Sequence, residues 1–236
     1  MNKIMSSARR AVQKYDMIAD SDVIAVGLSG GKDSAALLYA LSKMRSFYPV
    51  EFDVKAVNID LRFSGVDTDV SELEKLCDEL GVEFIVKRTD IGRIVFDERK
   101  ESNPCSLCSR MRRAALIDEA KRLGCTRIAL GHHEDDAVET FMMNLFNGGR
   151  IGCFSPVTYL DDKDIYLIRP LIFCSQSLIA GEVRKSGLPV VKSECPADKS
   201  GDRKKTRELI TQLNREYPKL REKIIGAMQR GSVDNW

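Results

Sequence analysis

The stretch VIAVGLSGGKDS, residues 23–34, indicates the fold and a first candidate site. Its apolar beginning predicts a strand buried on both faces, as in a parallel sheet covered by helices. Gly30 and Gly31 permit a sharp turn and a close approach to a ligand. A helical pattern begins at Ser34. Because exposed amides at a helix N-terminus attract anions, the stretch predicts a site for a nucleotide phosphate.

Strand and helix patterns alternate along the rest of the chain. Strands are expected over residues 52–60, 83–89, 127–130 and 188–195, with a short extended element over 166–169. Helices are expected over 3–18, 34–44, 68–80 and 177–185, and over 202–228 with a break near Pro218. Residues 104–113 lead into another expected helix that runs through Leu123, and a further one carries Val138, Phe141, Met142 and Leu145 and stops at 147–149. This alternation is typical of βαβ units. We therefore predict an α/β fold, Rossmann-like, with a mostly parallel sheet and helices on both faces.

Residues 1–236 are predicted to form a single domain, with an N-terminal helix in 1–20, an α/β core over 21–195 and a helical tail over 196–236. The charged fraction of 31% is ordinary for a soluble enzyme, and the net charge of +2 neither demands nor excludes nucleic acid. No apolar run approaches the roughly 18 residues of a membrane span, and no signal peptide is recognisable. We therefore expect a cytoplasmic protein without membrane contact, in which seven cysteines do not form a disulfide framework.

Cys105 and Cys108 form a C-x-x-C pair, which can bind a metal or cluster or cycle as a disulfide. The sequence holds no second pair of this kind to complete a four-ligand zinc site, so a three-cysteine site is the more natural interpretation. Cys195 is the best third candidate, because its predicted strand ends at the same sheet edge as the glycine loop. Its alternative role is a buried or capped thiol. Cys153 and Cys174 are weaker candidates.

Polar residues follow two of the predicted strands, at the edge where ligands of open parallel sheets bind. These candidates are Asp60, Gly131, His132, Asp135 and Asp136. We expect one of Asp135 and Asp136 to cap the next helix and the other to serve the nucleotide, for example by holding magnesium. Asp60 is equally suited to bind near the nucleotide or to cap the turn that follows it.

Two basic clusters follow the candidate cysteines. They consist of Arg110, Arg112 and Arg113 after the C-x-x-C pair, and of Arg203, Lys204, Lys205 and Arg207 after Cys195. Each cluster alone is typical of a solvated surface. If the cysteines meet in space, however, the clusters meet around them and can attract the backbone of a polyanion.

Several motifs together carry a family resemblance. SGGKDS is similar to the loop of the N-type ATP pyrophosphatases, the PP-loop proteins that split ATP to AMP and pyrophosphate, and it lacks the Walker spacing. The other motifs are PCSLCSRMRR (104–113), GHHEDDAVET (131–140), NLFNGG (144–149) and IRPLIF (168–173). In this order and spacing they resemble the tRNA 2-thiocytidine synthetases, from about Asp16 to the C-terminal helix.

The resemblance implies an enzyme that uses ATP and Mg²⁺ to adenylate the C2 oxygen of an anticodon-loop cytosine in tRNA and replaces this oxygen with sulfur. It implies that Cys105, Cys108 and Cys195 hold a [4Fe–4S] cluster whose iron without a protein ligand carries the sulfur. The implied ATP loop consists of Ser29, Gly30, Gly31, Lys32, Asp33 and Ser34. We assign Lys32, Asp135 and Asp136 to catalysis, Asp60, Gly131 and His132 to the nucleotide, and both basic clusters to tRNA. The implied partners are tRNA and a sulfur donor such as a cysteine desulfurase persulfide, with a homodimer left open.

Alternatives of two classes stay open. A tRNA lysidine synthetase-like ligase or another PP-loop tRNA sulfurtransferase would share the ATP loop, but the ligase needs no cluster and leaves the three cysteines unexplained. A nucleotide-binding redox or metal sensor without catalysis would bind metal and release no pyrophosphate.

Overall fold

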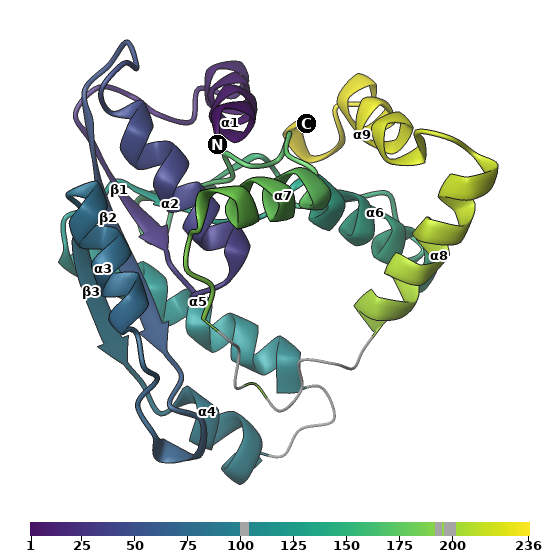
Figure 1. Ribbon diagram of the computed structural model, residues 1–236. Helices are drawn as coiled ribbons and strands as arrows, with labels where there is room; N and C mark the ends of the chain where they lie inside the picture. The colour runs from purple at the N-terminus through teal and green to yellow at the C-terminus, as the bar shows by residue number, and fades with distance from the viewer. Residues whose placement is uncertain (100–103, 192–194, 196–201) are drawn as a thin grey trace.

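The computed structural model describes residues 1–99, 104–191, 195 and 202–236 (Figure 1). Its strands form one sheet in the order β3-β2-β1-β4-β6-β5. They are β1 (Asp22–Gly27), β2 (Phe52–Asp60), β3 (Glu83–Arg88), β4 (Arg127–Ala129), β5 (Val157–Leu160) and β6 (Ile165–Ile168). β5 pairs antiparallel with β6, and the pairings of the other neighbours are parallel. The predicted mostly parallel sheet is therefore confirmed.

Helices surround this sheet in Figure 1. They are α1 (Asn2–Lys14), α2 (Lys32–Met44), α3 (Ser71–Leu80), α4 (Ile91–Arg93), α5 (Pro104–Arg122), α6 (Glu134–Gly148), α7 (Gln176–Ser186), α8 (Asp202–Glu216) and α9 (Leu220–Arg230). Short helical segments occupy η1 (Phe63–Gly65), η2 (Ile94–Arg99) and η3 (Val233–Asn235). The predicted break in the C-terminal helical region separates α8 from α9 around Pro218.

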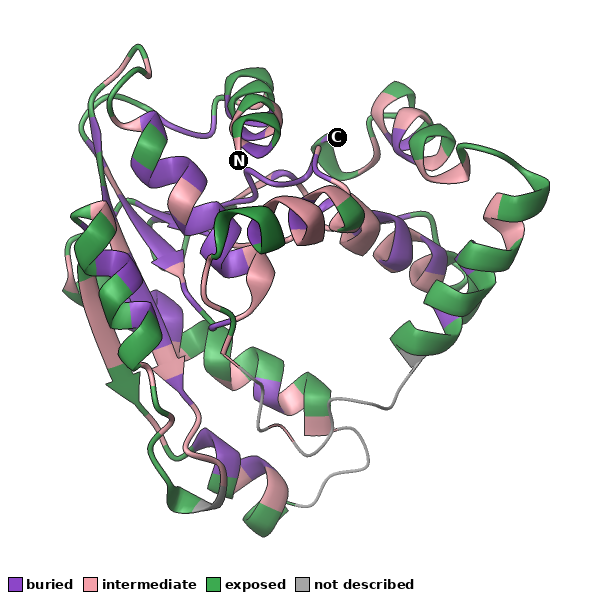
Figure 2. Ribbon diagram, in the orientation of Figure 1, coloured by how far each residue is buried: buried purple, intermediate pink, exposed green. Residues whose placement is uncertain are grey.

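Successive residues of β1 enter two different cores. Ile24 and Val26 belong to the larger core, which also takes residues from α1, α2, α6 and α7. Ala25 belongs to a smaller core with Leu116 and Ala120 of α5. Because successive side chains of a strand point to opposite faces, this division shows that helices cover both faces of the central sheet. Figure 2 shows the resulting buried colour along β1 and much of α2. This burial explains why the strand is a continuous apolar run.

The chain departs from the predicted pattern after α7. Residues 188–191 are not in a strand, so the strand predicted over 188–195 is wrong for these residues, and 192–194 lie outside the described part. Instead, Val191 N–H donates to the Gly30 carbonyl at 2.9 Å, so the apolar segment covers the glycine loop. The antiparallel edge strand β5 has no counterpart in the sequence prediction. None of the described helices is long and apolar enough to cross a membrane.

Candidate functional site

The glycine loop between β1 and α2 is held by its own hydroxyl groups. Ser34 Oγ accepts from Ser29 N–H at 3.2 Å and donates to the Gly31 carbonyl at 2.9 Å. Gly30 adopts a φ of +82°, which favours glycine. Among the described residues no side chain caps the N-terminus of α2 at Gly31. The amides of its first turn therefore remain suited to an anion, as predicted for a phosphate loop.

The end of β4 lies directly against this loop. A Cβ on Gly131 would lie 3.2 Å from the Asp33 carbonyl carbon and from Ser34 N, so only glycine fits without a shift of the backbone. His133 continues the contact, since its Nε2 lies 3.8 Å from Asp33 Oδ1. Asp33 in turn accepts from Lys32 Nζ at 2.7 Å, and both side chains are partly exposed. The structure thus joins two motifs that lie about 100 residues apart in sequence.

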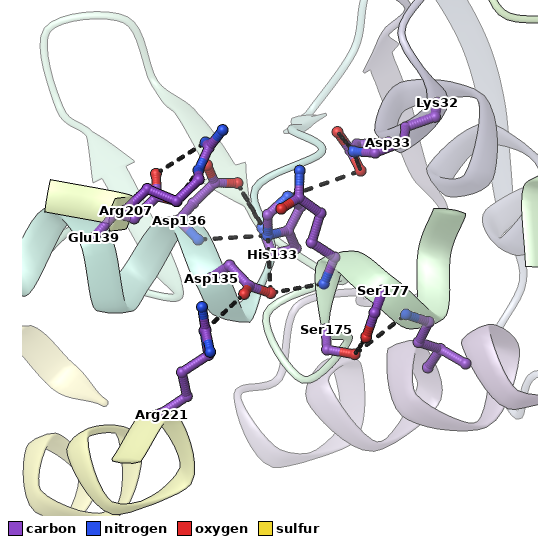
Figure 3. Close-up of polar contacts among 12 residues, drawn as sticks. Lys32, Asp33, His133, Asp135, Asp136, Glu139, Ser175, Ser177, Arg207 and Arg221 are labelled. Carbon is purple, nitrogen blue, oxygen red and sulfur yellow. Dashed lines mark hydrogen bonds and ion pairs between the residues drawn. The ribbon is translucent and has the colours of Figure 1, made fainter. Parts of the chain in front are cut away.

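The two candidate aspartates at the start of α6 both have partners within the protein (Figure 3). Asp136 and His133 form a capping box: His133 N–H donates to Asp136 Oδ2 at 3.0 Å, and Asp136 N–H donates to His133 Nδ1 at 3.4 Å. Asp135 accepts from Gln176 N–H at 2.6 Å and lies 2.9 Å from Arg221 Nε. Asp136 thus takes the capping role expected for one of the pair. Asp135 links α6 to α7 and α9.

Asp60 organises the loop that follows β2. Its side chain is nearly fully buried and accepts from Arg62 N–H at 3.0 Å, Thr68 N–H at 3.1 Å and the Thr68 hydroxyl at 2.8 Å. These three donors match the capping alternative for this residue. Its contact with the nucleotide stays a prediction.

The three candidate metal ligands come together at the start of α5. Cys105 is exposed, Cys108 is buried and Cys195 is half-buried. Burial raises the pKa of Cys108, Arg112 lowers it, and the neighbouring Cys195 and Cys105 raise it. These mutual effects require the three thiols to lie near one another, although Cys195 is distant in sequence. Within the described part of the chain, no three His, Cys, Asp or Glu side chains form a group that could hold a metal ion, so the thiols approach without forming a closed ligand set.

The weaker cysteine candidates are inert thiols. Cys153 donates to the Ala137 carbonyl at 3.4 Å, and burial raises its pKa to about 12. Burial likewise raises the pKa of Cys174 to about 12. Because the thiolate is the metal-binding form, both residues are poor ligands in this environment.

The two basic clusters have different environments. On α8, Arg207 donates to Glu139 from Nε at 2.7 Å and from Nη2 at 3.3 Å (Figure 3), and Arg203 Nη1 lies 3.6 Å from Asp136. Lys204 lies 4.0 Å from Glu208, and Lys205 is exposed. The α5 cluster of Arg110, Arg112 and Arg113 is exposed. Arg113 and Arg203 both act on the charge of His132, so the two clusters do approach each other.

Two side chains, one after β4 and one after β6, contact the same aromatic ring. The imidazole centroid of His132, which follows β4, lies 5.1 Å from the Phe154 ring centroid. Cζ of Arg169, which follows β6, lies 5.0 Å from the same centroid. Burial, and then Arg169, lower the pKa of His132 to about 4. Arg169 and Phe154 are absent from the sequence-predicted site. The signals for Arg169 were its place at the end of a predicted extended element and within the IRPLIF motif.

The comparisons with known proteins agree with this architecture. Residues 3–213 match the PP-loop domain family. The chain is 36% identical to the tRNA-cytidine(32) 2-sulfurtransferase of Syntrophotalea carbinolica, over 96% of this chain and 88% of that protein. It is also 36% identical to the protein of the same name from Ralstonia nicotianae, over 96% of this chain and 73% of that protein. The chain belongs to this sulfurtransferase family of PP-loop proteins.

A solved structure also resembles this PP-loop protein. The U34-tRNA thiolase NcsA from Methanococcus maripaludis, solved with its [4Fe–4S] cluster, superposes with a TM-score of 0.80 at 25% sequence identity. The match covers 96% of this chain and 78% of that chain. The family resemblance predicted from the motifs is therefore confirmed, together with the α/β fold.

Proposed function

We propose that this protein is an ATP-dependent tRNA sulfurtransferase that adenylates the C2 oxygen of cytosine 32 and replaces it with sulfur. The observation that carries the proposal is the approach of Cys195 to the C-x-x-C pair of α5. Its relatives are named for sulfur transfer to this cytidine, and its structural neighbour is a tRNA thiolase with a [4Fe–4S] cluster.

The glycine loop would bind the phosphates of ATP. The first-turn amides of α2 and the ammonium of Lys32 are the donors at this position, and Ser29 and Ser34 fix the shape of the loop. Asp33 is the partly exposed carboxylate at this site, suited to Mg²⁺ that accompanies the phosphates. Asp136 acts through His133, whose Nε2 faces Asp33, and is therefore a positioning residue. Asp135 has the same status, since it fixes the start of α6.

The sulfur-carrying group would be held by Cys105, Cys108 and Cys195. Thiolates are the usual ligands of iron–sulfur clusters, and the nearby Arg112 favours the thiolate of Cys108. A [4Fe–4S] cluster bound here through three cysteines would offer one iron for the incoming sulfur. The exposed arginines of α5 surround this position and would hold the tRNA backbone.

The proposal includes two partners and a location. Sulfur would come from a donor such as a cysteine desulfurase persulfide, and the exposed position of Cys105 is consistent with access for such a donor. We also propose a cytoplasmic location, where ATP and tRNA are available. A homodimer would be recognised by sedimentation of the purified chain.

Anaerobic purification tests the function directly. The wild-type chain should contain about four irons, release pyrophosphate only with ATP and tRNA, and incorporate sulfur at cytosine 32. Cys105→Ala and Cys195→Ala should abolish sulfur incorporation and lower the iron content. Cys125→Ala is the matched control, because this thiol is buried in the smaller core. Sulfur incorporation by iron-free protein would refute the cluster. Attachment of lysine would indicate a ligase, and metal binding without pyrophosphate release would indicate a sensor.

A further inference from the structure

The side chains of His132, Phe154 and Arg169 pack together beyond the ends of β4 and β6, and we call this cluster of side chains the ring pocket. Arg169 is 5% exposed, whereas His132 and Phe154 are partly exposed. The ring pocket therefore combines a buried cation with two flat rings that solvent reaches. Flat rings at a protein surface are the usual partners of unstacked RNA bases.

Two nitrogens in the ring pocket are buried without a partner in the described part of the chain: His132 Nδ1 and Arg169 Nε. Arg169 Nη1 is satisfied, because it donates to the Ser155 carbonyl at 2.6 Å and approaches Thr158 Oγ1 at 3.2 Å. A buried polar group without a partner is costly, and its presence in a folded protein calls for a ligand. Arg169 Nε–H can only donate a hydrogen bond, whereas the neutral imidazole of His132 can accept one at Nδ1.

The ring pocket lies between the two parts of the proposed active site. His132 directly follows Gly131, which packs against Asp33 and Ser34 of the glycine loop. On the other side, Arg113 of α5 acts on the charge of both His132 and Arg169. Arg113 follows Cys108 by five residues, about 8 Å along a helix. A group bound in the ring pocket is thus close to the ATP loop and to the cysteine-bearing helix.

We propose that the ring pocket binds the target base, with Arg169 Nε–H donating to N3 of cytosine and the N4 amino group donating to His132 Nδ1. This inference rests on the proposed function and adds the residues that choose the base. It leaves the C2 oxygen without a hydrogen bond from either residue, so this oxygen stays available for adenylation. Phe154 would flank the base as its stacking partner, while His132 meets the edge of the base.

The same pattern rejects uracil. Uracil carries a hydrogen on N3, which would face the N–H donor of Arg169, and an oxygen at C4 in place of the amino group. A site built to form hydrogen bonds discriminates strongly against a ligand that leaves its buried groups unpaired. The ring pocket therefore offers a physical reason for a preference for cytidine.

Binding requires the Phe154 ring to move, because both nitrogens are buried beside it. The backbone at this position is anchored, since the C-terminal Trp236 donates from Nε1 to the Phe154 carbonyl at 2.8 Å. The inference therefore requires rotation of the ring while its backbone stays in place.

Binding of fluorescent anticodon stem-loops to the full chain, with a non-hydrolysable ATP analogue, tests the inference without a cluster or a sulfur donor. The loops carry cytidine, uridine or 3-deazacytidine at the target position; the last lacks only the N3 acceptor. Wild-type protein should bind the cytidine loop about 10- to 100-fold more tightly than the other two. Arg169→Met should bind all three within about twofold. Arg169→Lys keeps the positive charge and should also lose the preference, because its ammonium does not reproduce the fixed Nε–H.

Arg150→Met is the matched control, because Arg150 is an exposed arginine whose side chain donates to Asn144 Oδ1 at 3.1 Å. It should keep the wild-type preference. Equal affinity of the wild-type chain for cytidine and 3-deazacytidine would overturn the inference without any variant, and so would a folded Arg169 variant that still prefers cytidine. Loss of ATP binding in Arg169→Met would show that this residue serves the nucleotide instead. A wild-type chain that binds none of the RNAs would refute the proposed function, and the inference with it.

Discussion

Gly131→Ala should weaken ATP binding although residue 131 belongs to a different strand end from the glycine loop. The added Cβ would lie 3.2 Å from the Asp33 carbonyl carbon and Ser34 N, and 3.4 Å from Asp33 O. All three neighbours are backbone atoms at the start of α2, so relief requires a shift of this helix turn or of the β4 end. Overpacking of this kind typically costs about 1–3 kcal/mol. In a chain of 236 residues this corresponds to a fall in Tm of roughly 2–6 °C.

The loop amides move with the turn, and we expect the Kd for ATP to rise about tenfold. Gly181→Ala is the control, because the added methyl group meets nothing within 4 Å and lies inside α7. It should raise the free energy of unfolding by about 0.5–1 kcal/mol and leave ATP binding unchanged. Calorimetric titration measures the Kd for ATP, and thermal melting measures the change in stability. Wild-type ATP affinity in a Gly131→Ala protein would refute the coupling between the strand end and the loop.

Four further changes test other parts of the structure. Glu139→Gln should cost about 1–3 kcal/mol in urea unfolding, because this buried carboxylate holds an α8 arginine. The pKa of His132 is about 4 in the folded chain against 6.5 in the unfolded chain, so the unfolded chain binds more protons between these pH values. The free energy of unfolding should therefore fall by as much as about 3 kcal/mol as the pH drops from 6.5 to 4. His132→Gln should remove this loss. In the metal-free protein, iodoacetamide should modify the exposed Cys105 much faster than Cys153, because a pKa of about 12 keeps the Cys153 thiol protonated. Equal rates of modification would contradict the burial of Cys153. Arg113→Ala should reduce the slope of log binding constant against log salt by about one for RNA.

The predictions from local pattern succeed where one residue type has one physical use. Gly30 and Gly31 between an apolar run and a helix indicate the phosphate loop, because few other residues allow that turn. The parallel sheet follows from the alternation of strand and helix patterns, because parallel strands need a crossover connection. The edge strand β5 escapes prediction because none of its four residues is fully buried and they lack the apolar run of the central strands.

The partners of individual side chains cannot be predicted from the local sequence pattern. Glu139 looks like an ordinary surface residue of a helix, yet its partner Arg207 lies 68 residues away in α8. Asp135 likewise meets Arg221 only because α9 packs on α6. Arg169 has no carboxylate partner in the described chain, a property that appears only when its surroundings are known. These contacts support the positioning role that we propose for Asp135 and Asp136.

The fold also divides the positive charge that the sequence distributes over two similar clusters. On α8, the charges of Arg203 and Arg207 are compensated by Glu139 and Asp136, so they stabilise the packing of α8 on α6. The α5 cluster has no such compensation among the described residues and projects beside the cysteines. Counterion release by RNA requires uncompensated cations. We therefore propose that α5 binds most of the tRNA backbone, whereas Arg203 and Arg207 of α8 hold that helix against α6.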